Sequence, residues 1–251
     1  MDFDVTFETK CWENDWRLML QTDHLAEMIN NCGYAFAEKI LFINNVNNPE
    51  KVREYAEKAV KKGIIDKYVM VEEYADEVLK HFDIEKDDFA GGYYYSISEL
   101  VSIYLCRTKY LLHFSSDSYI PNEYKAVEWI DPAIKLMEET PEFIAANPVW
   151  NYHFDEGENE SYDETDEFWI SKGFSDQCYL INTDVFKNRI YNCHHEVAEK
   201  YPKYGGELFE KRVFSYMMTE GKSRLTSKKL SYISCNVTKK QIIKEMIGKR
   251  I

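Results

Sequence analysis

The sequence has little glycine, little proline and a deficit of basic residues. Its 251 residues include 10 Gly and 6 Pro, which excludes a collagen-like chain and a chain built largely of linkers. Lys and Arg number 31 against 44 Asp and Glu, a formal net charge of −13. Nucleic-acid binders need a cationic face for the phosphates, so we expect no nucleic-acid partner. No run approaches the roughly 20 apolar residues of a membrane-spanning helix, so we expect no transmembrane segment.

Several short motifs are also absent. The six cysteines contain no CxxC pair and are spread over the whole chain, unlike a disulfide framework or a zinc ribbon. This spread predicts reduced thiols in a cytoplasmic protein. The first residues are acidic and lack the pattern of a signal peptide, which agrees with that prediction. The sequence contains no GxGxxG, no P-loop and no HExxH, and adjacent His194 and His195 point about 100° apart on a helix, a poor metal pair.

Hydrophobic residues and tyrosine are well represented. The hydrophobic share of 45% is typical of a folded domain with a sizeable core. The 19 tyrosines are unusual. Because tyrosine combines an apolar ring with a polar tip, it suits cores that open onto polar ligands such as sugars and nucleotides.

The first half of the chain alternates between two hydrophobic periods. We predict strands at 5–7, 39–43, 68–71 and 109–114, and helices at 23–32, 49–62, 73–81 and 96–107. Such alternation predicts βαβ units, and therefore an α/β fold with a mainly parallel central sheet flanked by helices.

The second half is less regular. We predict a helix at 131–139 with Pro132 in its first turn, β-rich segments at 168–170 and 173–181, and helices around 183–199 and 207–218. Residues 155–167 hold 8 carboxylates in 13 positions, which predicts a solvated loop, with a mobile lid beside a binding site as the sharper alternative. Basic residues gather in the tail, from 222 to 250.

Polar residues follow the predicted strands at 9–10, 44–45, 72–73 and 115–117. Ligands of parallel sheets bind at the carboxyl ends of the strands. Asp117 is the notable residue among them, because a carboxylate in this place can hold a divalent cation that neutralises a diphosphate. The alternative is a turn aspartate that bonds to its own backbone.

Residues 109–118 resemble the strand and DxD motif of GT-A fold glycosyltransferases, with Ser115 at the first motif position and Asp117 at the last. The resemblance implies one GT-A-like domain over residues 1–251. About 1–121 would be the nucleotide-sugar-binding half, and about 122–251 the acceptor-binding half, with a small antiparallel element and C-terminal helices. It further implies a nucleoside-diphosphate sugar donor, Mn²⁺ or Mg²⁺ at Asp117, and a glycan, lipid-linked saccharide or glycoprotein acceptor.

Candidate donor-binding residues are those at or near strand ends. The nucleotide-sugar candidates are Thr6, Glu8, Asn44, Glu73, Ser115, Ser116 and Asp117. Basic residues of the tail, such as Lys222 or Arg224, are candidates for meeting the diphosphate.

Three carboxylates are candidates for the catalytic role. Residues 173–187 are similar to the acceptor-side strand of the same family, which places Asp176 at a turn that meets the acceptor. Residues 205–212 resemble the late glutamate-bearing helix of many glycosyltransferases, which makes Glu207 and Glu210 candidates as well. A carboxylate near the sugar could deprotonate the acceptor hydroxyl. The alternatives are a surface turn for Asp176, a capping residue for Glu207 and a solvated charge for Glu210.

Two other functions remain open at this point. A nucleotidyltransferase could use a similar sheet with an acidic metal site, but residues 8–12 provide no glycine-rich basic loop after the first strand. A catalytically inactive sugar-binding or scaffold protein is the other, because Ser115 stands where the motif has an acid.

Overall fold

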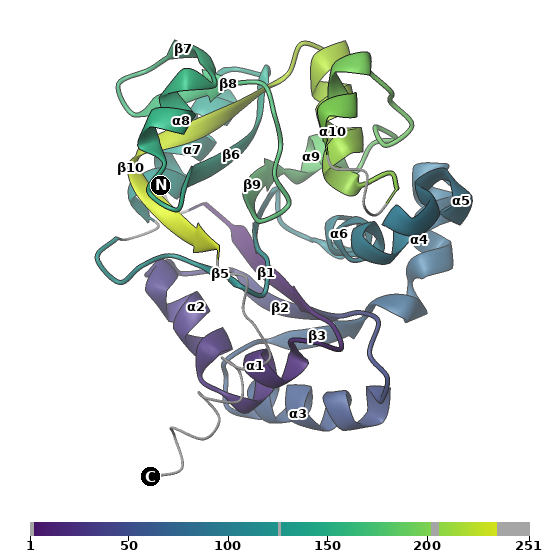
Figure 1. The fold of residues 1–251 in the computed structure, drawn as a ribbon. Helices are drawn as coiled ribbons and strands as arrows, with labels where there is room; N and C mark the ends of the chain where they lie inside the picture. Colours follow the sequence, from purple (N-terminus) through teal and green to yellow (C-terminus); the bar gives the residue numbers. More distant parts are fainter. Residues whose placement is uncertain (1–2, 125–126, 202–205, 235–251) are drawn as a thin grey trace.

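A computed structural model describes residues 3–124, 127–201 and 206–234 (Figure 1). The strands are β1 (Val5–Cys11), β2 (Glu38–Ile43), β3 (Lys67–Met70), β4 (Tyr110–Phe114), β5 (Ser118–Tyr119), β6 (Phe143–Trp150), β7 (Ser161–Glu164), β8 (Phe168–Ser171), β9 (Cys178–Asn182) and β10 (Ser223–Ser234). The α-helices are α1 (Trp16–Gln21), α2 (His24–Cys32), α3 (Pro49–Lys61), α4 (Ala75–Phe82), α5 (Lys86–Phe89), α6 (Tyr93–Leu105), α7 (Val127–Glu139), α8 (Phe154–Asn159), α9 (Thr183–Phe186) and α10 (Phe209–Thr219). Short 3₁₀ helices are η1 (Val71–Glu73), η2 (Ala90–Gly92) and η3 (Glu196–Lys200).

One central sheet joins the two halves of the chain. Among the described residues its strand order is β3-β2-β1-β4-β9-β6-β10-β8-β7, and β5 pairs with β10 outside this path. The pairs β2–β3, β1–β2, β1–β4 and β6–β10 are parallel, whereas β9 is antiparallel to both β4 and β6. The predicted α/β class with a mainly parallel, helix-flanked sheet is therefore confirmed. The antiparallel element of the second half is present as β7, β8 and β10, and it extends the same sheet.

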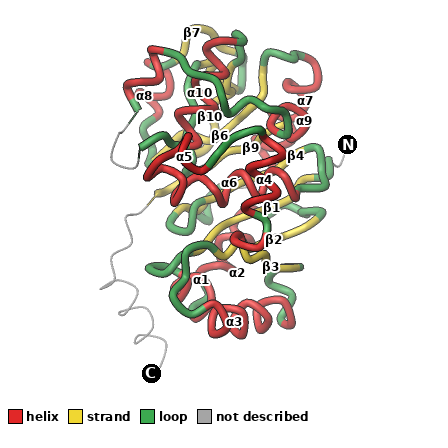
Figure 2. Tube along the Cα trace, turned by 90° about the vertical axis from the view of Figure 1, so that its right-hand side faces the viewer, coloured by secondary structure: helices red, strands yellow, loops and turns green. Residues whose placement is uncertain are grey.

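Helices cover both faces of the sheet. Side chains alternate between faces along a strand, and β2 shows this: Leu41 and Ile43 join one apolar cluster, while Ile40 and Phe42 join the other. The first cluster includes residues of α1, α2, α3 and α7, and the second includes residues of α4, α6, α9 and α10. Figure 2 shows the strands running between these helices.

Local sequence signals place several helices correctly. At α3, the Asn48 side chain accepts a hydrogen bond from the Lys51 backbone N–H (3.1 Å), and Pro49 occupies the first helical turn. This is the arrangement that asparagine and proline favour at a helix start. The fixed start of α3 matters for the site, because the loop that precedes it carries Asn44.

The predicted start of the helix near Pro132 is wrong. The helix is α7, which begins at Val127, so that Pro132 lies inside it. Trp129 and Ile130, upstream of the proline, are fully buried in the core against the sheet. Their burial outweighs the hydrogen bond that the proline cannot donate.

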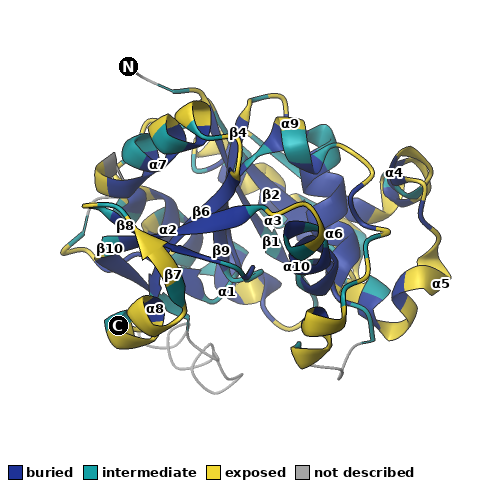
Figure 3. Cartoon of the chain, turned by 90° about the horizontal axis from the view of Figure 1, so that it is seen from above, coloured by how far each residue is buried: buried dark blue, intermediate teal, exposed yellow. Residues whose placement is uncertain are grey.

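The acidic stretch 155–167 is not a loop as predicted, because much of it forms α8 and β7. Figure 3 shows both elements as mostly exposed. Several of these carboxylates pair with basic residues that lie far away in the sequence. Glu164 pairs with Lys228 (2.6 Å) and Glu160 with Arg224 (3.2 Å). Pairing of β7 with β8 therefore orders a segment whose composition suggested a solvated loop.

The predicted helix at 183–199 is also wrong over most of its length. Only α9 and η3 form, and residues between them are irregular. Phe186, Ile190 and Tyr191 in this region are buried against the second cluster, so packing rather than a continuous helix accommodates them. The helix predicted at 207–218 is α10, which begins two residues later.

None of the helices in the described residues combines the length and apolar character needed to cross a membrane. Cys11, Cys32, Cys106, Cys178 and Cys193 are free thiols, and all but Cys193 are buried.

Gly206 generates a stability prediction. Its φ is +89°, and a Cβ at this position would lie 2.9 Å from the Phe89 carbonyl oxygen. Gly221 also has a positive φ, of +65°, but a Cβ there would meet nothing within 4 Å. Left-handed backbone costs a residue with a Cβ about 1–2 kcal/mol, and the close contact adds to it.

We therefore expect Gly206→Ala to lower the free energy of unfolding by about 3 kcal/mol and Gly221→Ala by only about 1 kcal/mol. Urea denaturation of both variants measures the difference. Equal losses would contradict the close packing of Gly206 on η2.

Candidate functional site

A cavity of about 500 Å³ opens at the edge of the sheet where parallel strands end. Its walls come from the segments that follow β1, β2 and β4, from the start of α6 and from the turn before β9. Because β9 is antiparallel to β4, its first residues lie at the same edge as the carboxyl ends of the parallel strands. This is the edge at which α/β sheets bind ligands.

Five of the predicted site residues line this cavity together. They are Asn44, Ser115, Ser116, Asp117 and Asp176. They come from three separate parts of the sequence, after β2, after β4 and before β9. The strand-end argument therefore places most of the proposed donor-binding residues around one space.

Thr6 and Glu8 lie elsewhere. The strand predicted at 5–7 continues to Cys11, so both residues lie within β1 and not at its end. Thr6 is fully buried, and its hydroxyl lies 2.8 Å from that of Thr108. Glu8 is 1% exposed, and its Oε1 lies 2.5 Å from Nδ1 of His113. The structure thus makes Thr6 and Glu8 internal residues of the sheet.

Glu73 and Glu207 also lie outside the cavity. Glu73 belongs to η1, after the edge strand β3, and pairs with Arg53 of α3. Glu207 precedes α10, and its carboxylate pairs with Lys211 (2.6 Å) and Arg212 (3.1 Å). Both carboxylates are thus engaged by basic side chains that do not line the cavity.

Glu210 lies beside the cavity through its contact with Asp176. It belongs to the first turn of α10, and its buried carboxyl group lies close enough to Asp176 to feel the charge of that side chain. Burial raises the pKa of Glu210 to about 8, and the negative charge of Asp176 adds to the rise. At neutral pH the Glu210 side chain therefore holds a proton next to the Asp176 carboxylate.

The turn after β4 is held by hydrogen bonds on both sides. Ser115 Oγ lies 3.0 Å from Oδ1 of Asp117 and 2.9 Å from Oε1 of Gln177, so its single proton can serve either oxygen. The Ser115 backbone N–H donates to the Gln177 carbonyl at 2.9 Å. Ser115, which replaces an acid in the motif, thus links Asp117 to the turn that carries Asp176.

Asp15 is a cavity residue that sequence reasoning missed. Its Oδ1 accepts the Trp12 backbone N–H at 2.7 Å, and its Oδ2 accepts the hydroxyl of Ser116. Burial raises the pKa of Asp15 to about 6, with a contribution from the charge of Asp117. The only sequence signal was its position, four residues beyond the end of β1.

An aromatic wall was missed as well. Trp12, Tyr94 and Tyr95 line the cavity, and the ring centroids of Trp12 and Tyr94 are 6.1 Å apart in an edge-on arrangement. Tyr94 and Tyr95 are 39% and 46% exposed, which is unusual for large rings at a helix start. The backbone carbonyl of Tyr94 accepts a hydrogen bond from the Asn45 side chain (2.9 Å), which ties this wall to the loop after β2.

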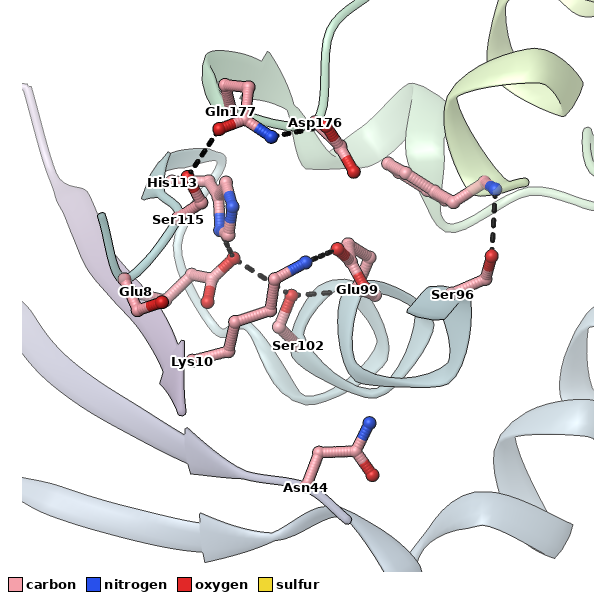
Figure 4. A network of polar contacts seen from close by, with 12 residues as sticks. Glu8, Lys10, Asn44, Ser96, Glu99, Ser102, His113, Ser115, Asp176 and Gln177 are labelled. Carbon is pink, nitrogen blue, oxygen red and sulfur yellow. Dashed lines mark hydrogen bonds and ion pairs between the residues drawn. The ribbon is translucent and has the colours of Figure 1, made fainter. Parts of the chain in front are cut away.

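Figure 4 shows how Lys10 faces this site from the end of β1. Its ammonium pairs with Glu99 of α6, which is 2% exposed. The buried Glu8, His113 and Ser102 lie beside this pair, where Ser102 Oγ donates to Glu8 Oε1 at 3.3 Å and His113 Nδ1 lies 2.5 Å from the same oxygen. The Lys10–Glu99 pair therefore connects the cavity to a buried polar network that does not itself line the cavity.

The cavity has an excess of negative charge. The described lining residues include the carboxylates Asp15, Asp117 and Asp176 and one ammonium, that of Lys10, which already pairs with Glu99. Burial raises the pKa of Asp117, and the charge of Asp176 raises it further. Carboxylates crowded into a partly buried space are stabilised by a bound cation.

The donor atoms fit a divalent cation in part. Among the described residues, no three His, Cys, Asp or Glu side chains come together as a preformed metal site. Asp15 and Asp117 offer hard carboxylate oxygens on one wall of the cavity. Mg²⁺ is commonly bound by one or two carboxylates together with water and substrate phosphates. The chemistry of these two carboxylates thus fits a cation that arrives with a phosphorylated ligand.

The comparisons with known proteins are limited to structural likeness. No family model matches the chain, and no curated protein matches its sequence. The chain is similar to the apo form of mouse xyloside xylosyltransferase 1, with a TM-score of 0.48 and 14% identity over 88% of this chain and 82% of that one.

It is also similar to GalNAc-T7 solved with UDP, GalNAc and Mn²⁺, with a TM-score of 0.48 and 10% identity. This match covers 92% of this chain and 44% of the GalNAc-T7 chain. Both TM-scores are below 0.5, so neither likeness decides the family or the activity.

The raised pKa of Glu210 predicts how stability depends on pH. Between pH 4.5 and 8 the folded protein retains a proton on Glu210 that the unfolded chain has released. The contribution of Glu210 to the free energy of unfolding is therefore fully present below about pH 4.5. It is lost as the pH rises through about 8.

We expect Glu210→Gln to be as stable as the unsubstituted protein at pH 5, and more stable at pH 8 by an amount on the order of a few kcal/mol. Urea denaturation at both pH values tests this. A Glu210→Gln variant that loses stability equally at both would mean that Glu210 is ionised in the folded state.

Proposed function

We propose that the protein is a glycosyltransferase, which moves a sugar from a nucleoside-diphosphate sugar to a glycan or glycoconjugate acceptor. One observation supports this above the others: Asn44, the Ser115–Ser116–Asp117 turn and Asp176 line one cavity at the carboxyl ends of β1, β2 and β4. These are residues that the resemblance to the GT-A family assigns to the donor and the acceptor. The cavity volume, about 500 Å³, is within the range of small-ligand sites.

The donor nucleotide would lie between the aromatic wall and the acidic turn. Tyr94, Tyr95 and Trp12 offer ring faces and edges to a base or a ribose. Asn44 and Asn45 supply amide groups that can bond to polar atoms of the nucleoside. The diphosphate would then be near Asp117 and Asp15, where it needs positive charge.

Mn²⁺ or Mg²⁺ would supply that charge. We propose that Asp117 holds the cation, with Asp15 as the second protein carboxylate on the same wall. When bound, such a cation stabilises the negative charge that develops on a diphosphate leaving group. Lys10 lies at the same cavity and contributes a fixed positive charge beside these carboxylates.

Asp176 is our proposed base for the acceptor hydroxyl. Of the three catalytic candidates it is the one that lines the cavity, whereas Glu207 is paired with Lys211 and Arg212. Glu210 acts as a positioning residue, because its buried carboxyl group lies against Asp176. A carboxylate held in this way can take the proton of a hydroxyl bound beside it.

Donor binding at this cavity should require both a divalent cation and the Asp117 carboxylate. We expect nucleoside-diphosphate sugars to raise the melting temperature only with Mn²⁺ or Mg²⁺, and Asp117→Asn to weaken this binding at least about tenfold, because a charge-assisted contact is lost. Calorimetric titration with UDP-, GDP- and dTDP-sugars measures it.

Asp163→Asn is the matched control, because it removes one carboxylate from the exposed face of β7. If no sugar nucleotide changes the melting temperature, or if both substitutions weaken binding equally, the proposed donor site is wrong.

The chemical step should depend on the Asp176 carboxylate. We expect Asp176→Asn to lower kcat for transfer or for donor hydrolysis roughly 10²–10⁴-fold, the usual contribution of a general base. Donor affinity should stay within a few fold, and Glu210→Gln should have a smaller effect on kcat. An Asp176→Asn variant with unchanged kcat would exclude Asp176 as the base.

A further inference from the structure

A second cavity adjoins the first one. It has a volume of about 590 Å³ and is lined by the segment before β9, by the end of β6 and by both ends of β10. Gln177 lines both cavities. Its Oε1 lies 2.9 Å from Oγ of Ser115 on the side of the first cavity and 2.9 Å from Oγ of Ser234 on the side of the second. A ligand in the second cavity would thus lie next to the proposed donor.

The two cavities differ in the sign of their charge. The described residues of the second cavity include Arg224, Lys172 and Lys200 against one carboxylate, Glu160. The first cavity holds three carboxylates against Lys10. In a chain with a net charge of −13, this local excess of positive charge favours anionic ligands.

Arg224 is built into the wall of the second cavity. Its residue is 6% exposed, and its guanidinium donates to Ser171 Oγ (Nη2, 2.9 Å), to Thr226 Oγ1 (Nε, 3.1 Å) and to Glu160 Oε2 (Nη2, 3.2 Å). Within the described part of the chain, no hydrogen bond engages Nη1. This atom would lie 3.6 Å from a Cβ at position 173, where the chain has a glycine. The absence of that Cβ leaves room beside Nη1.

Lys200 adds an exposed positive charge at the rim. It is exposed on η3 and lies over the ring of Phe214, 4.6 Å from its centroid. Among the described residues it forms no ion pair. Lys172, in contrast, donates to the backbone carbonyls of Gly221 (3.0 Å) and Lys222 (2.8 Å). Among the described residues, Nη1 of Arg224 and the ammonium of Lys200 are therefore the cationic groups open to a ligand.

Aromatic side chains complete the lining. Trp150, Phe174, Tyr201 and Tyr232 all contribute to the second cavity. The Tyr201 hydroxyl is fixed by the backbone of Phe174, since it donates to the Phe174 carbonyl at 2.7 Å and accepts its N–H at 2.9 Å. Rigid aromatic rings pack against the C–H faces of sugar rings, and a guanidinium binds carboxylates and phosphates through its fork of donors.

We infer that the second cavity binds an acceptor saccharide that carries an anionic group, a carboxylate or a phosphate, through Arg224 and Lys200. The acceptor role of this saccharide rests on the proposed function. The binding of an anionic saccharide in the second cavity can be tested independently of that function. The anionic group would lie beside Nη1 of Arg224, and the sugar ring between the aromatic residues. A hydroxyl of the same saccharide would then face Asp176, which adjoins Gln177 at the boundary of the two cavities.

The experiment compares charged and neutral sugars on the full chain without nucleotide. The probes are methyl glucuronide for the carboxylate, glucose 6-phosphate for the phosphate and methyl glucoside as the neutral reference, with Kd measured by NMR titration. We expect at least one charged probe to bind about tenfold more tightly than the glucoside, as one charge-assisted contact provides. The two charged probes distinguish a carboxylate-bearing from a phosphate-bearing acceptor.

Variants assign the preference to the cavity. Because Lys200 is exposed, the Lys200→Gln variant should fold normally. It should reduce the preference for the charged probe several-fold. Lys229→Gln, the matched control, removes the same charge from the exposed part of β10, where the lysine pairs with Glu167, and should leave the preference unchanged. Arg224→Lys keeps the positive charge but removes the paired N–H donors of the guanidinium. This variant should lose most of the preference for the charged probe while circular dichroism shows a folded chain.

Two results would overturn the inference. One is the absence of any preference for a charged probe, whether all probes bind alike or none binds. The other is an equal effect of Lys200→Gln and Lys229→Gln. A nucleotide-sugar titration of the same samples separates this test from the proposed function. If charged sugars bind and no nucleotide sugar does, the proposed transferase function is wrong, whereas the proposed site for an anionic saccharide stands.

Discussion

The antiparallel pairing of β9 between β4 and β6 is the constraint on which the site depends. Strand β9 joins the parallel strands of the first half to β6 and β10 of the second. Because it runs against its neighbours, the turn that precedes it meets the carboxyl ends of β1 and β4. Asp176 and Gln177 are thereby brought to the edge that carries Asp117. A parallel β9 would carry them to the opposite edge, and the two proposed cavities would not adjoin.

Charge separation follows from the same arrangement. The first cavity gathers the carboxylates Asp15, Asp117 and Asp176, and burial with mutual repulsion raises the pKa of Asp15 and of Asp117. The second cavity gathers Arg224 and Lys200. Net charge is a poor guide to such sites, because the −13 of the chain includes the acidic residues 155–167, of which Glu160 and Glu164 pair with basic residues of β10. The acidic cavity suits a cation with a diphosphate, and the basic cavity suits an anion.

Strand ends were the most informative signal in the sequence, and their limits are physical. Asn44 and Asp117 were chosen as strand-end residues and line one cavity, because a buried apolar strand followed by polar residues marks the ligand edge of a parallel sheet. Thr6 and Glu8 were misplaced, because β1 continues through polar residues whose burial depends on distant partners such as His113. Asp15 was missed for a related reason, since its role comes from contacts across the fold with the turn after β4. Periodicity describes one segment at a time, so it cannot show partners that only tertiary folding provides.

The central claim is that the acidic edge of the sheet binds a cation together with a nucleoside diphosphate. Paramagnetic broadening by Mn²⁺ in the presence of UDP tests it most directly, because it locates the ion on the folded protein residue by residue. The account predicts selective broadening of the amide resonances of Asp15, Ser116, Asp117 and Asp176, and much weaker broadening when UDP is omitted. Broadening that is confined to the exposed carboxylates of α8 and β7, or that does not depend on UDP, would contradict it.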